Sequence, residues 1–447
     1  MKGIKLYPDV YFFRYGDYTY IRNTATQKDY LYNEIVFDIL DCIKAGLSSE
    51  DEIIARMSEI YDAGEDELKN DIEALISEMT DEKIIRRSGR SEKYEGGEVI
   101  RDFLREYTCA NHMLMSACVE LTYRCNERCI HCYIDDGKPT RPELRLADYV
   151  KIFDQLKECG CSSVLITGGE PTLHPDFLEI VRYAKKVGLL VDIYTNALKI
   201  DDSLIDELIL IKPNSVSFSL YGGTADVHDA ITQVPGSFES SLNTIMKFKC
   251  AGLNVYIKTV VMKQNYKSYE DLLKLGKRLG IGITPALSIM PTHSGVNADK
   301  FRLLSVPEYE EIFKLEDKYN KKYTDFQISD RVEFICASGL NAISIDPFGY
   351  MHPCNACPEV LGNAKYDSIR SAWEYSDRLR YLRSLKFDDI SDSCEQCPDK
   401  RWCAICIGSA QRENGDISPC RDTCMIAKAY HSVYNLMKDG VSHEEEV

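Results

Sequence analysis

The chain begins with strand-like alternation of hydrophobic and polar residues and continues with helical spacing. Near the N-terminus, aromatic and polar residues alternate in three short runs typical of strands: residues 10–15, 18–22 and 28–32. Three helical patterns follow. Asn33 can cap the first, Ser48 or Ser49 with acids three residues on opens the second, and apolar residues at helical spacing over 68–79 mark the third. Residues 1–92 are therefore predicted to form a small winged-helix-like α/β module.

From residue 116 onward, strand-like and helix-like segments alternate. The strand-like segments are 119–122, 164–167, 191–194, 216–220, 255–258 and 285–288. Amphipathic stretches such as 177–187 and 204–210 separate them. This alternation predicts βαβ units and a parallel sheet, and six units fit a partial (β/α)6 TIM-like barrel. We place this α/β core at residues 113–330, after a polar linker at 93–112.

The hydrophobic pattern stops near residue 336. The segment that follows, assigned to residues 331–435, is rich in cysteine, glycine and proline and has little periodicity. We expect it to owe its order to bound metal more than to an apolar core. Residues 436–447 are predicted to be an acidic tail with a frayed end.

Composition excludes two classes of partner. The chain has 447 residues, 44% hydrophobic and 28% charged, with a net charge of −17. Binding to nucleic acid needs clustered Lys and Arg, so an acidic chain is not expected to bind it. There is no run of eighteen apolar residues and no long apolar N-terminal stretch, so we expect no membrane span and a cytoplasmic location.

Eighteen cysteines then require an explanation. Disulfides are rare in a reducing cytosol, so metal ligation is the remaining interpretation. The cysteines are also clustered, because three lie within residues 125–132 and eight within residues 354–424.

The first cluster is Cys125, Cys129 and Cys132, on the loop that follows the first barrel strand. Parallel sheets and barrels place active sites at this end of their strands. Three thiolates leave a four-iron cluster one ligand short, and an open iron can bind substrate. The alternative is a zinc site with His131 as its fourth ligand.

The C-x3-C-x2-C spacing resembles the signature of the radical S-adenosylmethionine (SAM) superfamily. One strand later, a turn after Thr167 resembles the family's GGEP motif. The resemblance implies that the [4Fe–4S] cluster binds SAM, that the turn binds the SAM amino group, and that His131 lies near the adenine. It also implies nucleoside contacts for the polar residues that end strands three and four, although turn or capping roles are the alternative. The implied cofactor-binding residues are His131, Gly168, Gly169, Glu170, Pro171, Thr195, Asn196 and Ser219.

A stretch over residues 219–238 resembles one common among peptide-modifying members of this superfamily. It contains Tyr221, the pair His228-Asp229, and a Pro-Gly-Ser-Phe turn. Those members carry Arg-Gly after the His-Asp pair, where this chain has Thr232 and Gln233. The function of that Arg is therefore not carried over.

The second cysteine cluster resembles the SPASM extension, which holds two auxiliary [4Fe–4S] clusters. The resemblance gives the first auxiliary cluster Cys336, Cys354 and Cys406, with Cys357 as a plausible fourth ligand. It gives the second Cys394, Cys397 and Cys403, with either Cys420 or Cys424; we favour Cys424, at the opening of the final helix. A zinc ribbon is the alternative.

The N-terminal module resembles the PqqD-like recognition element of RiPP-modifying enzymes (RiPPs are ribosomally made, modified peptides), over residues 4–88. This implies that a precursor's leader peptide adds as a strand beside residues 28–32, with the helix at 68–79 walling the groove. A DNA-binding winged helix and a structural cap are the alternatives.

Together these features predict a peptide maturase most similar to sactipeptide and ranthipeptide synthases. It would use a 5′-deoxyadenosyl radical to form a thioether between a Cys sulfur and a Cα or Cβ, with a flavodoxin- or ferredoxin-type reductant. Carbon–carbon crosslinking, modification of a folded protein or small molecule, and a metal-sensing regulator are alternatives. Asn355 stands where sulfatase-activating relatives carry an acid, which argues against formylglycine formation. No catalytic acid or base is assigned; Tyr221, His228 and His293 are only candidates.

Overall fold

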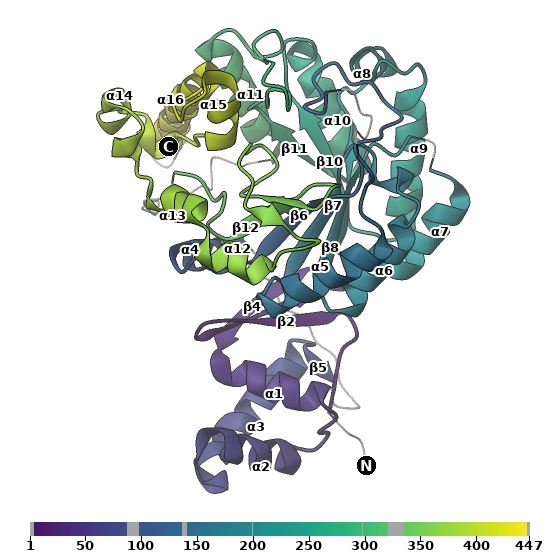
Figure 1. Cartoon of the computed structure of the whole chain (residues 1–447), viewed down its shortest axis with the longest axis vertical. Helices are drawn as coiled ribbons and strands as arrows, with labels where there is room; N and C mark the ends of the chain where they lie inside the picture. The colour runs from purple at the N-terminus through teal and green to yellow at the C-terminus, as the bar shows by residue number, and fades with distance from the viewer. Residues whose placement is uncertain are drawn as a thin grey trace. The chain divides into compact units, whose positions relative to one another are not determined.

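The computed structural model describes residues 4–86, 98–135, 141–198, 200–296, 298–320 and 335–444. The chain divides into two compact units, Met1–Met113 and Leu114–Val447, and each is described by itself (Figure 1).

The first unit contains a three-stranded antiparallel sheet in the order β2-β3-β4. Its strands are β2 (Val10–Tyr15), β3 (Tyr18–Asn23) and β4 (Lys28–Asn33), which confirms the three predicted strands. Three helices follow, α1 (Glu34–Lys44), α2 (Glu50–Tyr61) and α3 (Glu65–Asp81). A short ladder of β1 (Lys5–Leu6) and β5 (Ile85–Arg86) closes the module.

The predicted helix starts are correct, but only one of them is capped by its side chain. Ser49 accepts a hydrogen bond from the Glu52 backbone, and the Glu52 carboxylate accepts one from Ser49, which completes a capping box. Asn33 occupies the N-cap of α1, yet its side chain makes no capping bond. Apolar residues of all three helices, among them Leu40, Ile53 and Ile76, are buried in one core.

The segment expected to be a linker contains helix α4 (Glu98–Ala110). Leu104, Thr108 and Cys109 are buried at i, i+4 and i+5, so the helix has one packed face. Phe103 and Tyr107 pack edge-on against the Tyr18 ring, at centroid distances of 5.1 and 4.8 Å. The apolar residues at positions 99, 100, 103, 104 and 107 recur at helical spacing, so the pattern did indicate a helix and the expectation of a linker was wrong. The Gly96-Gly97 part of the expected linker lies outside the described residues.

The second unit is built on one nine-stranded sheet. Six parallel strands lie in chain order and confirm the partial barrel: β6 (Ser116–Glu120), β7 (Ser163–Thr167), β8 (Leu190–Thr195), β9 (Ser215–Ser219), β10 (Val255–Val260) and β11 (Gly282–Ala286). The connecting helices are α5 (Leu146–Glu158), α6 (Phe177–Lys186), α7 (Asp202–Ile211), α8 (Ala225–Thr232), α9 (Ser237–Cys250) and α10 (Tyr269–Leu279).

The sixth strand starts three residues before the predicted segment. It pairs with β10 from Gly282 to Ala286, whereas we predicted residues 285–288. Gly282 and Thr284 are not apolar, so the prediction placed the strand on the apolar residues that follow them.

The cysteine-rich segment shares this sheet, which corrects the expectation that metal rather than a core orders it. Strand β12 (Ala342–Ile345) pairs in parallel with β6, and β13 (Tyr350–His352) and β14 (Gly362–Asn363) continue the sheet. Ile343, Ile345 and Met351 are buried in the same core as the barrel strands. The signal was missed because β12 is only four residues long.

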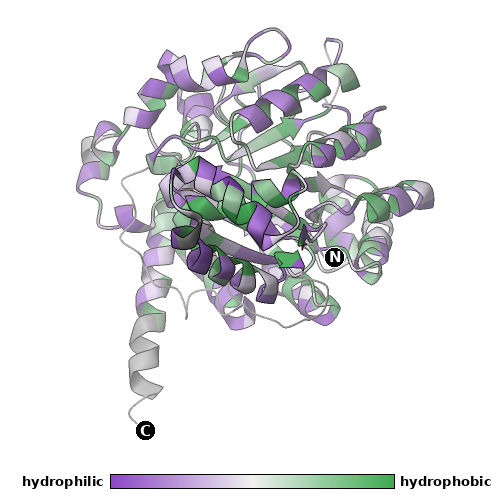
Figure 2. Ribbon diagram, turned by 90° about the horizontal axis from the view of Figure 1, so that it is seen from below, coloured by the Kyte–Doolittle hydropathy of each residue, from purple (hydrophilic) through white to green (hydrophobic). Residues whose placement is uncertain are grey.

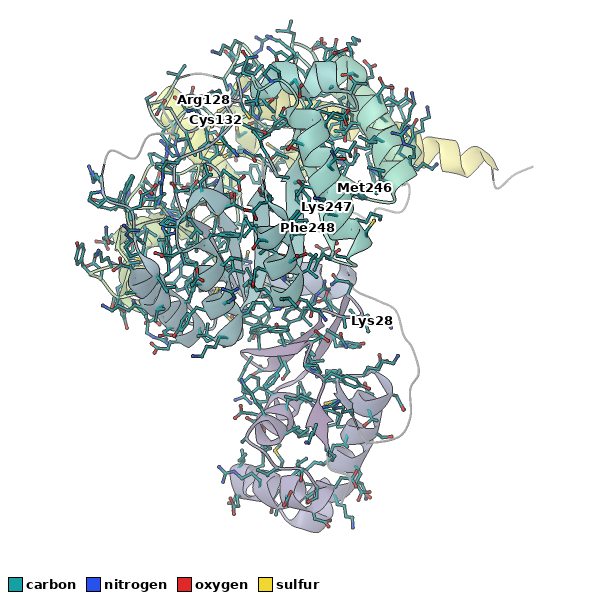
Figure 3. All side chains as sticks on the ribbon, turned by 90° about the vertical axis from the view of Figure 1, so that its right-hand side faces the viewer. Lys28, Arg128, Cys132, Met246, Lys247 and Phe248 are labelled. Atoms are coloured by element: carbon teal, nitrogen blue, oxygen red, sulfur yellow. The ribbon has the colours of Figure 1, made fainter. Side chains whose placement is uncertain are left out.

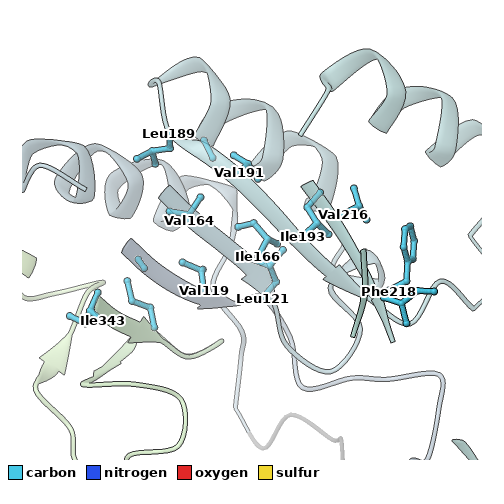
Figure 4. Close-up of a cluster of buried hydrophobic side chains, with 14 of the residues drawn as sticks. Val119, Leu121, Val164, Ile166, Leu189, Val191, Ile193, Val216, Phe218 and Ile343 are labelled. Carbon is cyan, nitrogen blue, oxygen red and sulfur yellow. The ribbon is translucent and has the colours of Figure 1, made fainter. Parts of the chain in front are cut away.

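Successive residues of each barrel strand lie on opposite faces of the sheet. Val119, Ile166, Ile193 and Phe218 are buried between the strands and the surrounding helices (Figure 4). Hydropathy varies around these helices, so each shows hydrophobic and hydrophilic residues (Figure 2). The alternate strand residues point into the barrel and are mostly polar. None of the described helices is long and apolar enough to span a membrane.

A buried ionic network fastens the C-terminal helices to the core. The Arg302 guanidinium pairs with Glu413 of α15 (Ile407–Asn414) at 2.5 Å and with Asp422 of α16 (Arg421–Glu444) at 2.9 Å. It also donates to the Ile289 carbonyl at 3.0 Å. Helix α16 runs through most of the predicted acidic tail, and residues 445–447, in the end predicted to be frayed, lie outside the described part.

Replacing Arg302 by Met is expected to lower the free energy of unfolding by about 3–5 kcal/mol, because it leaves two carboxylates buried without a cation. Anaerobic denaturant titration measures this change. Arg182→Met is the control, since Arg182 pairs with Glu179 and Glu207 while 42% exposed and should cost at most about 1 kcal/mol. Equal losses in the two variants would contradict the assignment.

Candidate active site

The cysteine loop, residues 121–135, leaves the C-terminal end of β6. Backbone hydrogen bonds fix it to the neighbouring strand and helix: Leu121 donates to Thr167, Arg128 to Thr232, and Ile130 to Ile231. Cys132 and Arg128 lie close together at this end of the barrel unit (Figure 3). The loop therefore stands where the sequence placed it, at the carboxyl edge of the sheet.

The three thiols of this loop lie near one another. Burial raises the pKa of Cys125 to about 12, with a smaller contribution from the charge of Cys132. Burial likewise raises the pKa of Cys129, and both other thiols add to the effect. The Asn196 amide and the Glu127 backbone donate to the Cys125 sulfur at 3.7 and 3.5 Å. Such donors stabilise a ligating thiolate.

This donor set fits an iron–sulfur cluster. Among the described residues, no group of three or more His, Cys, Asp or Glu side chains is placed to hold a single metal ion. A four-iron cluster does not require that convergence, because each thiolate binds a different iron. All eighteen cysteines are described, and each is a free thiol.

The two glycines after β7 hold a turn against the cysteine loop. A Cβ on Gly168 would lie 2.4 Å from the Thr122 carbonyl oxygen, and one on Gly169 would lie 2.4 Å from that of Arg124. The Gly169 and Glu170 N–H groups donate to these same carbonyls at 2.7 and 2.8 Å. The absence of side chains at these two positions therefore admits the backbone of the cysteine loop.

Glu170 is fully buried and its carboxylate is largely committed. Oε1 accepts bonds from the Thr172 backbone and hydroxyl and from the Thr195 hydroxyl, and Oε2 accepts one from the Asn196 N–H at 2.8 Å. Within the described structure Oε2 accepts this one bond, so it retains capacity for the ammonium of SAM. Thr195 and Asn196 thus orient Glu170, and their predicted contact with the nucleoside stays a prediction.

The histidines occupy different surroundings. His131 contacts the Tyr221 ring edge-on at 4.8 Å, and burial lowers its pKa to about 4. Its Nδ1 is buried without a hydrogen-bond partner in the described structure. His228 is fully buried; its Nδ1 accepts a bond from the Tyr221 N–H, and its Nε2 has no hydrogen-bond partner among the described residues.

A polar cluster that sequence reasoning missed surrounds Glu120, the last residue of β6. The Tyr133 hydroxyl donates to its carboxylate at 2.5 Å, and the Tyr123 hydroxyl at 3.4 Å. Burial raises the pKa of Glu120 to about 7. The His293 ring packs against both tyrosines, at 5.2 and 5.4 Å. The sequence feature that could have revealed this cluster is Glu120 itself, an acid at an inward strand position beside the cysteine loop.

The structure brings the first group of auxiliary cysteines together. Burial raises the pKa of Cys354, and the thiol of Cys406 adds to this. Cys357 is buried beside Cys354, with its thiol directed at Glu359 and Gln411. Cys336 is linked to Cys354 through Ser338, whose N–H donates to the Cys336 sulfur at 3.4 Å and whose hydroxyl bonds Cys354. Cys357 as fourth ligand stays a proposal.

In the second group of auxiliary cysteines, the structure places Cys424 near the other thiols and Cys420 elsewhere. Burial raises the pKa of Cys424, and the next contributions come from Cys394 and Cys397, so these three thiols are neighbours. Cys420 is buried and bonds Glu413 within the Arg302 network instead. Helix α16, which carries Cys424, is held by a stack of Trp402 on His431 at 3.7 Å.

Comparison with known proteins identifies the class. The radical SAM superfamily model matches residues 119–276, the SPASM iron–sulfur cluster-binding domain matches 336–398, and coenzyme PQQ synthesis protein D (PqqD) matches 23–85. The chain is therefore a radical SAM enzyme with a SPASM domain and a PqqD-like element, as the resemblance predicted. Radical SAM domains bind a four-iron cluster with SAM, and SPASM domains bind auxiliary clusters.

Individual relatives share most of the chain. The AdoMet-dependent heme synthase of Methanosarcina barkeri is 27% identical over 66% of this chain and 92% of its own. The antilisterial bacteriocin subtilosin biosynthesis protein AlbA of Bacillus subtilis is 24% identical over 87% of both chains. The fold is similar to Streptococcus suis SuiB bound to precursor peptide SuiA, with a TM-score of 0.67 at 16% identity, over 94% of this chain and 99% of SuiB.

Gly169→Ala is expected to lower the free energy of unfolding by about 1–3 kcal/mol, because the new methyl group collides with the Arg124 carbonyl. Anaerobic unfolding measures the change, and iron content shows whether the cysteine loop still holds a cluster. Gly282→Ala is the control. Its Cβ meets only Tyr256, at an ordinary 3.4 Å, so stability should be unchanged or slightly higher. An unaffected Gly169→Ala protein would show that the turn does not clamp the loop.

Cys424→Ala and Cys420→Ala are expected to differ in iron content. Three four-iron clusters give about twelve irons per chain, and losing the second auxiliary cluster lowers this toward about eight. Anaerobic iron and sulfide assays should show that loss for Cys424→Ala and not for Cys420→Ala. The reverse result would make Cys420 the ligand. A Cys125/Cys129/Cys132→Ala protein should also fall to about eight.

Proposed function

We propose that this enzyme modifies a ribosomally made precursor peptide and forms a thioether between a Cys sulfur and a Cα or Cβ of another residue. The observation that carries this proposal is the union, on one chain, of a PqqD-like module, a radical SAM core and two further cysteine groups. Peptide substrates are also supported by relatives, since AlbA takes part in bacteriocin biosynthesis and SuiB binds its precursor peptide.

The leader peptide would dock on β4. This strand ends the sheet order β2-β3-β4, so among the described strands its second edge has no partner. The C-terminal end of α3 contacts this strand, because the Tyr30 hydroxyl donates to the Glu82 carbonyl at 3.1 Å and Tyr32 bonds Glu78. An edge strand beside a helix is the arrangement that binds a peptide by β-augmentation. Docking there raises the local concentration of the core peptide to about the mM range.

When bound, the SAM cluster would supply the electron that cleaves SAM to give the 5′-deoxyadenosyl radical, and the auxiliary clusters would offer a place for the electron released by crosslinking. Cys125, Cys129 and Cys132 would hold the first cluster, and the two auxiliary cysteine groups would hold the others. Each thioether removes a hydrogen atom from carbon and a proton and an electron from the Cys. Asn355 offers no carboxylate after Cys354, which supports crosslinking over formylglycine formation.

The reductant is proposed to be an acidic one-electron carrier of the flavodoxin or ferredoxin type. Arg124 and Arg128 are exposed on the cysteine loop, although the chain as a whole has a net charge of −17. Arg124, Arg141 and Arg145 line one surface cavity with Glu143 and His174. A cationic surface next to the SAM cluster complements an acidic carrier and speeds its encounter.

A second candidate function is modification of a small molecule, and the heme synthase relative favours it. The PqqD-like module distinguishes the two, because a small substrate has no leader for β4 to bind. Carbon–carbon crosslinking shares every feature described above and differs only in the product.

The test is anaerobic incubation of the holoenzyme with SAM, a reductant and the Cys-containing precursor peptide encoded nearest its gene. We expect 5′-deoxyadenosine and a peptide lighter by one hydrogen pair for each crosslink, with fragmentation placing the link on a Cys sulfur. A leaderless peptide is the matched control and should be modified far more slowly. Equal rates with and without the leader would remove the recognition role, and a crosslink that spares the Cys would identify carbon–carbon chemistry.

A further inference from the structure

The six barrel strands carry two acids, and one of them lies at the carboxyl end of the sheet. All six strands are described, and Glu120 and Asp192 are their acidic residues. Both point inward, because Val119 and Ile193 beside them point into the core between strands and helices. Asp192 pairs with Ser215, the first residue of β9, so it lies toward the amino end. Glu120 ends β6, where the cysteine loop begins.

Two tyrosines of the cysteine loop hold the Glu120 carboxylate in different ways. The Tyr133 hydroxyl donates to Oε1 at 2.5 Å and fixes the orientation of the carboxylate. The Tyr123 hydroxyl lies 3.4 Å from Oε2, which is long for a hydrogen bond, so it can also bond a ligand. Glu120 is only 2% exposed, whereas Tyr123 is partly exposed. A substrate would therefore meet this pair at the tyrosine.

The surroundings of Glu120 keep its carboxyl group ready to take up a proton. The other titratable groups that face it come from its own strand, helix α5, the β12–β13 hairpin and the cysteine loop: Cys118, Tyr149, Asp346, His352 and Cys132. Burial raises the pKa of Glu120 to about 7; the Tyr133 bond lowers the pKa, and the charge of Asp346 raises it. A carboxyl group that titrates near the working pH suits general acid–base chemistry.

Glu120 also lies between cysteines assigned to two different clusters. The loop that begins after it carries Cys132, whose pKa its charge raises. On the other edge of β6, strand β12 leads through β13 to Cys354. Glu120 and Cys354 both raise the pKa of Cys118, so this side of the barrel faces the first auxiliary group. A proton released between the two groups of cysteines therefore has Glu120 as a nearby acceptor.

We propose that Glu120 accepts the proton of the substrate cysteine, relayed by the Tyr123 hydroxyl. The inference rests on the proposed thioether function. A Cys thiol has an ordinary pKa of about 8.5, so at neutral pH a base must take its proton. The thiol S–H bond breaks, Tyr123 passes its own proton to Glu120 and regains one from the thiol, and a carboxyl O–H bond forms. The substrate C–H hydrogen goes to the 5′-deoxyadenosyl radical, and the electron left by C–S bond formation goes to an auxiliary cluster.

The test measures thioether and 5′-deoxyadenosine together, on iron-loaded holoenzyme with the Cys-containing precursor peptide. Glu120→Gln keeps an acceptor oxygen for Tyr133 but cannot take up the proton. At pH 7, 5′-deoxyadenosine should still form at the wild-type rate while thioether formation slows about a hundredfold. Wild-type crosslinking should rise through about pH 7 as Glu120 loses its proton. Glu120→Gln should lack that rise and recover only toward about pH 8.5, where the thiol ionises unaided.

Tyr123→Phe removes the relaying hydroxyl and leaves Glu120 its shorter bond, so it should show the same split between the two products. It decides the question if Glu120→Gln loses its iron. Asp154→Asn is the matched control, because Asp154 also accepts a bond from a tyrosine hydroxyl, that of Tyr183 at 2.9 Å, between the outer helices α5 and α6. It should crosslink like the wild type.

Iron content and unfolding midpoint show whether each variant is loaded and folded. Wild-type crosslinking and pH dependence in an iron-loaded Glu120→Gln or Tyr123→Phe protein would overturn the proposal. So would an equal loss of thioether and 5′-deoxyadenosine, because a proton acceptor is not needed to cleave SAM. A wild-type holoenzyme that forms no thioether would instead refute the proposed function, and this inference with it.

Discussion

Strand β6 is the element on which the second unit depends. It pairs with β7 on one edge and with β12 on the other, so the barrel and the cysteine-rich segment meet on a single strand. The same strand leads directly into the loop that carries Cys125, and its last residue is the buried Glu120. Replacing either pairing would displace the cysteine loop as well as a domain, because hydrogen bonds on both sides fix where the loop begins.

The sequence was sufficient for whatever depends on period and spacing. The three N-terminal strands, the parallel order of the core and the radical SAM, SPASM and PqqD domains were predicted and are confirmed. The short strand β12 was missed, because four residues carry too little pattern to distinguish a strand from a loop. Helix α4 was missed although its apolar residues recur at helical spacing, because the segment was interpreted as a polar linker. The Glu120 cluster depends on contacts between residues 120, 133 and 293, which no local pattern reveals. The assignment of individual ligands stays a prediction.

The two faces of the barrel strands have different roles. The outward face is apolar and gives the unit its core, while the inward face carries hydroxyls, Tyr194, Lys258 and Glu120. Burial of polar groups costs free energy unless each has a partner. In the structure the inward acids have partners within the chain, because Asp192 accepts bonds from Asn214 and Ser215 and Glu120 accepts them from two tyrosines.

The ladder between β6 and β12 has a consequence for electron flow. The loop after β6 carries Cys125, Cys129 and Cys132, and Cys354 follows β13, the strand that pairs with β12. Both lie in one hydrogen-bonded sheet, so no hinge lies between them along it. The spacing between the two proposed clusters is thus set by the hydrogen-bonded frame of the sheet and not by a joint between domains.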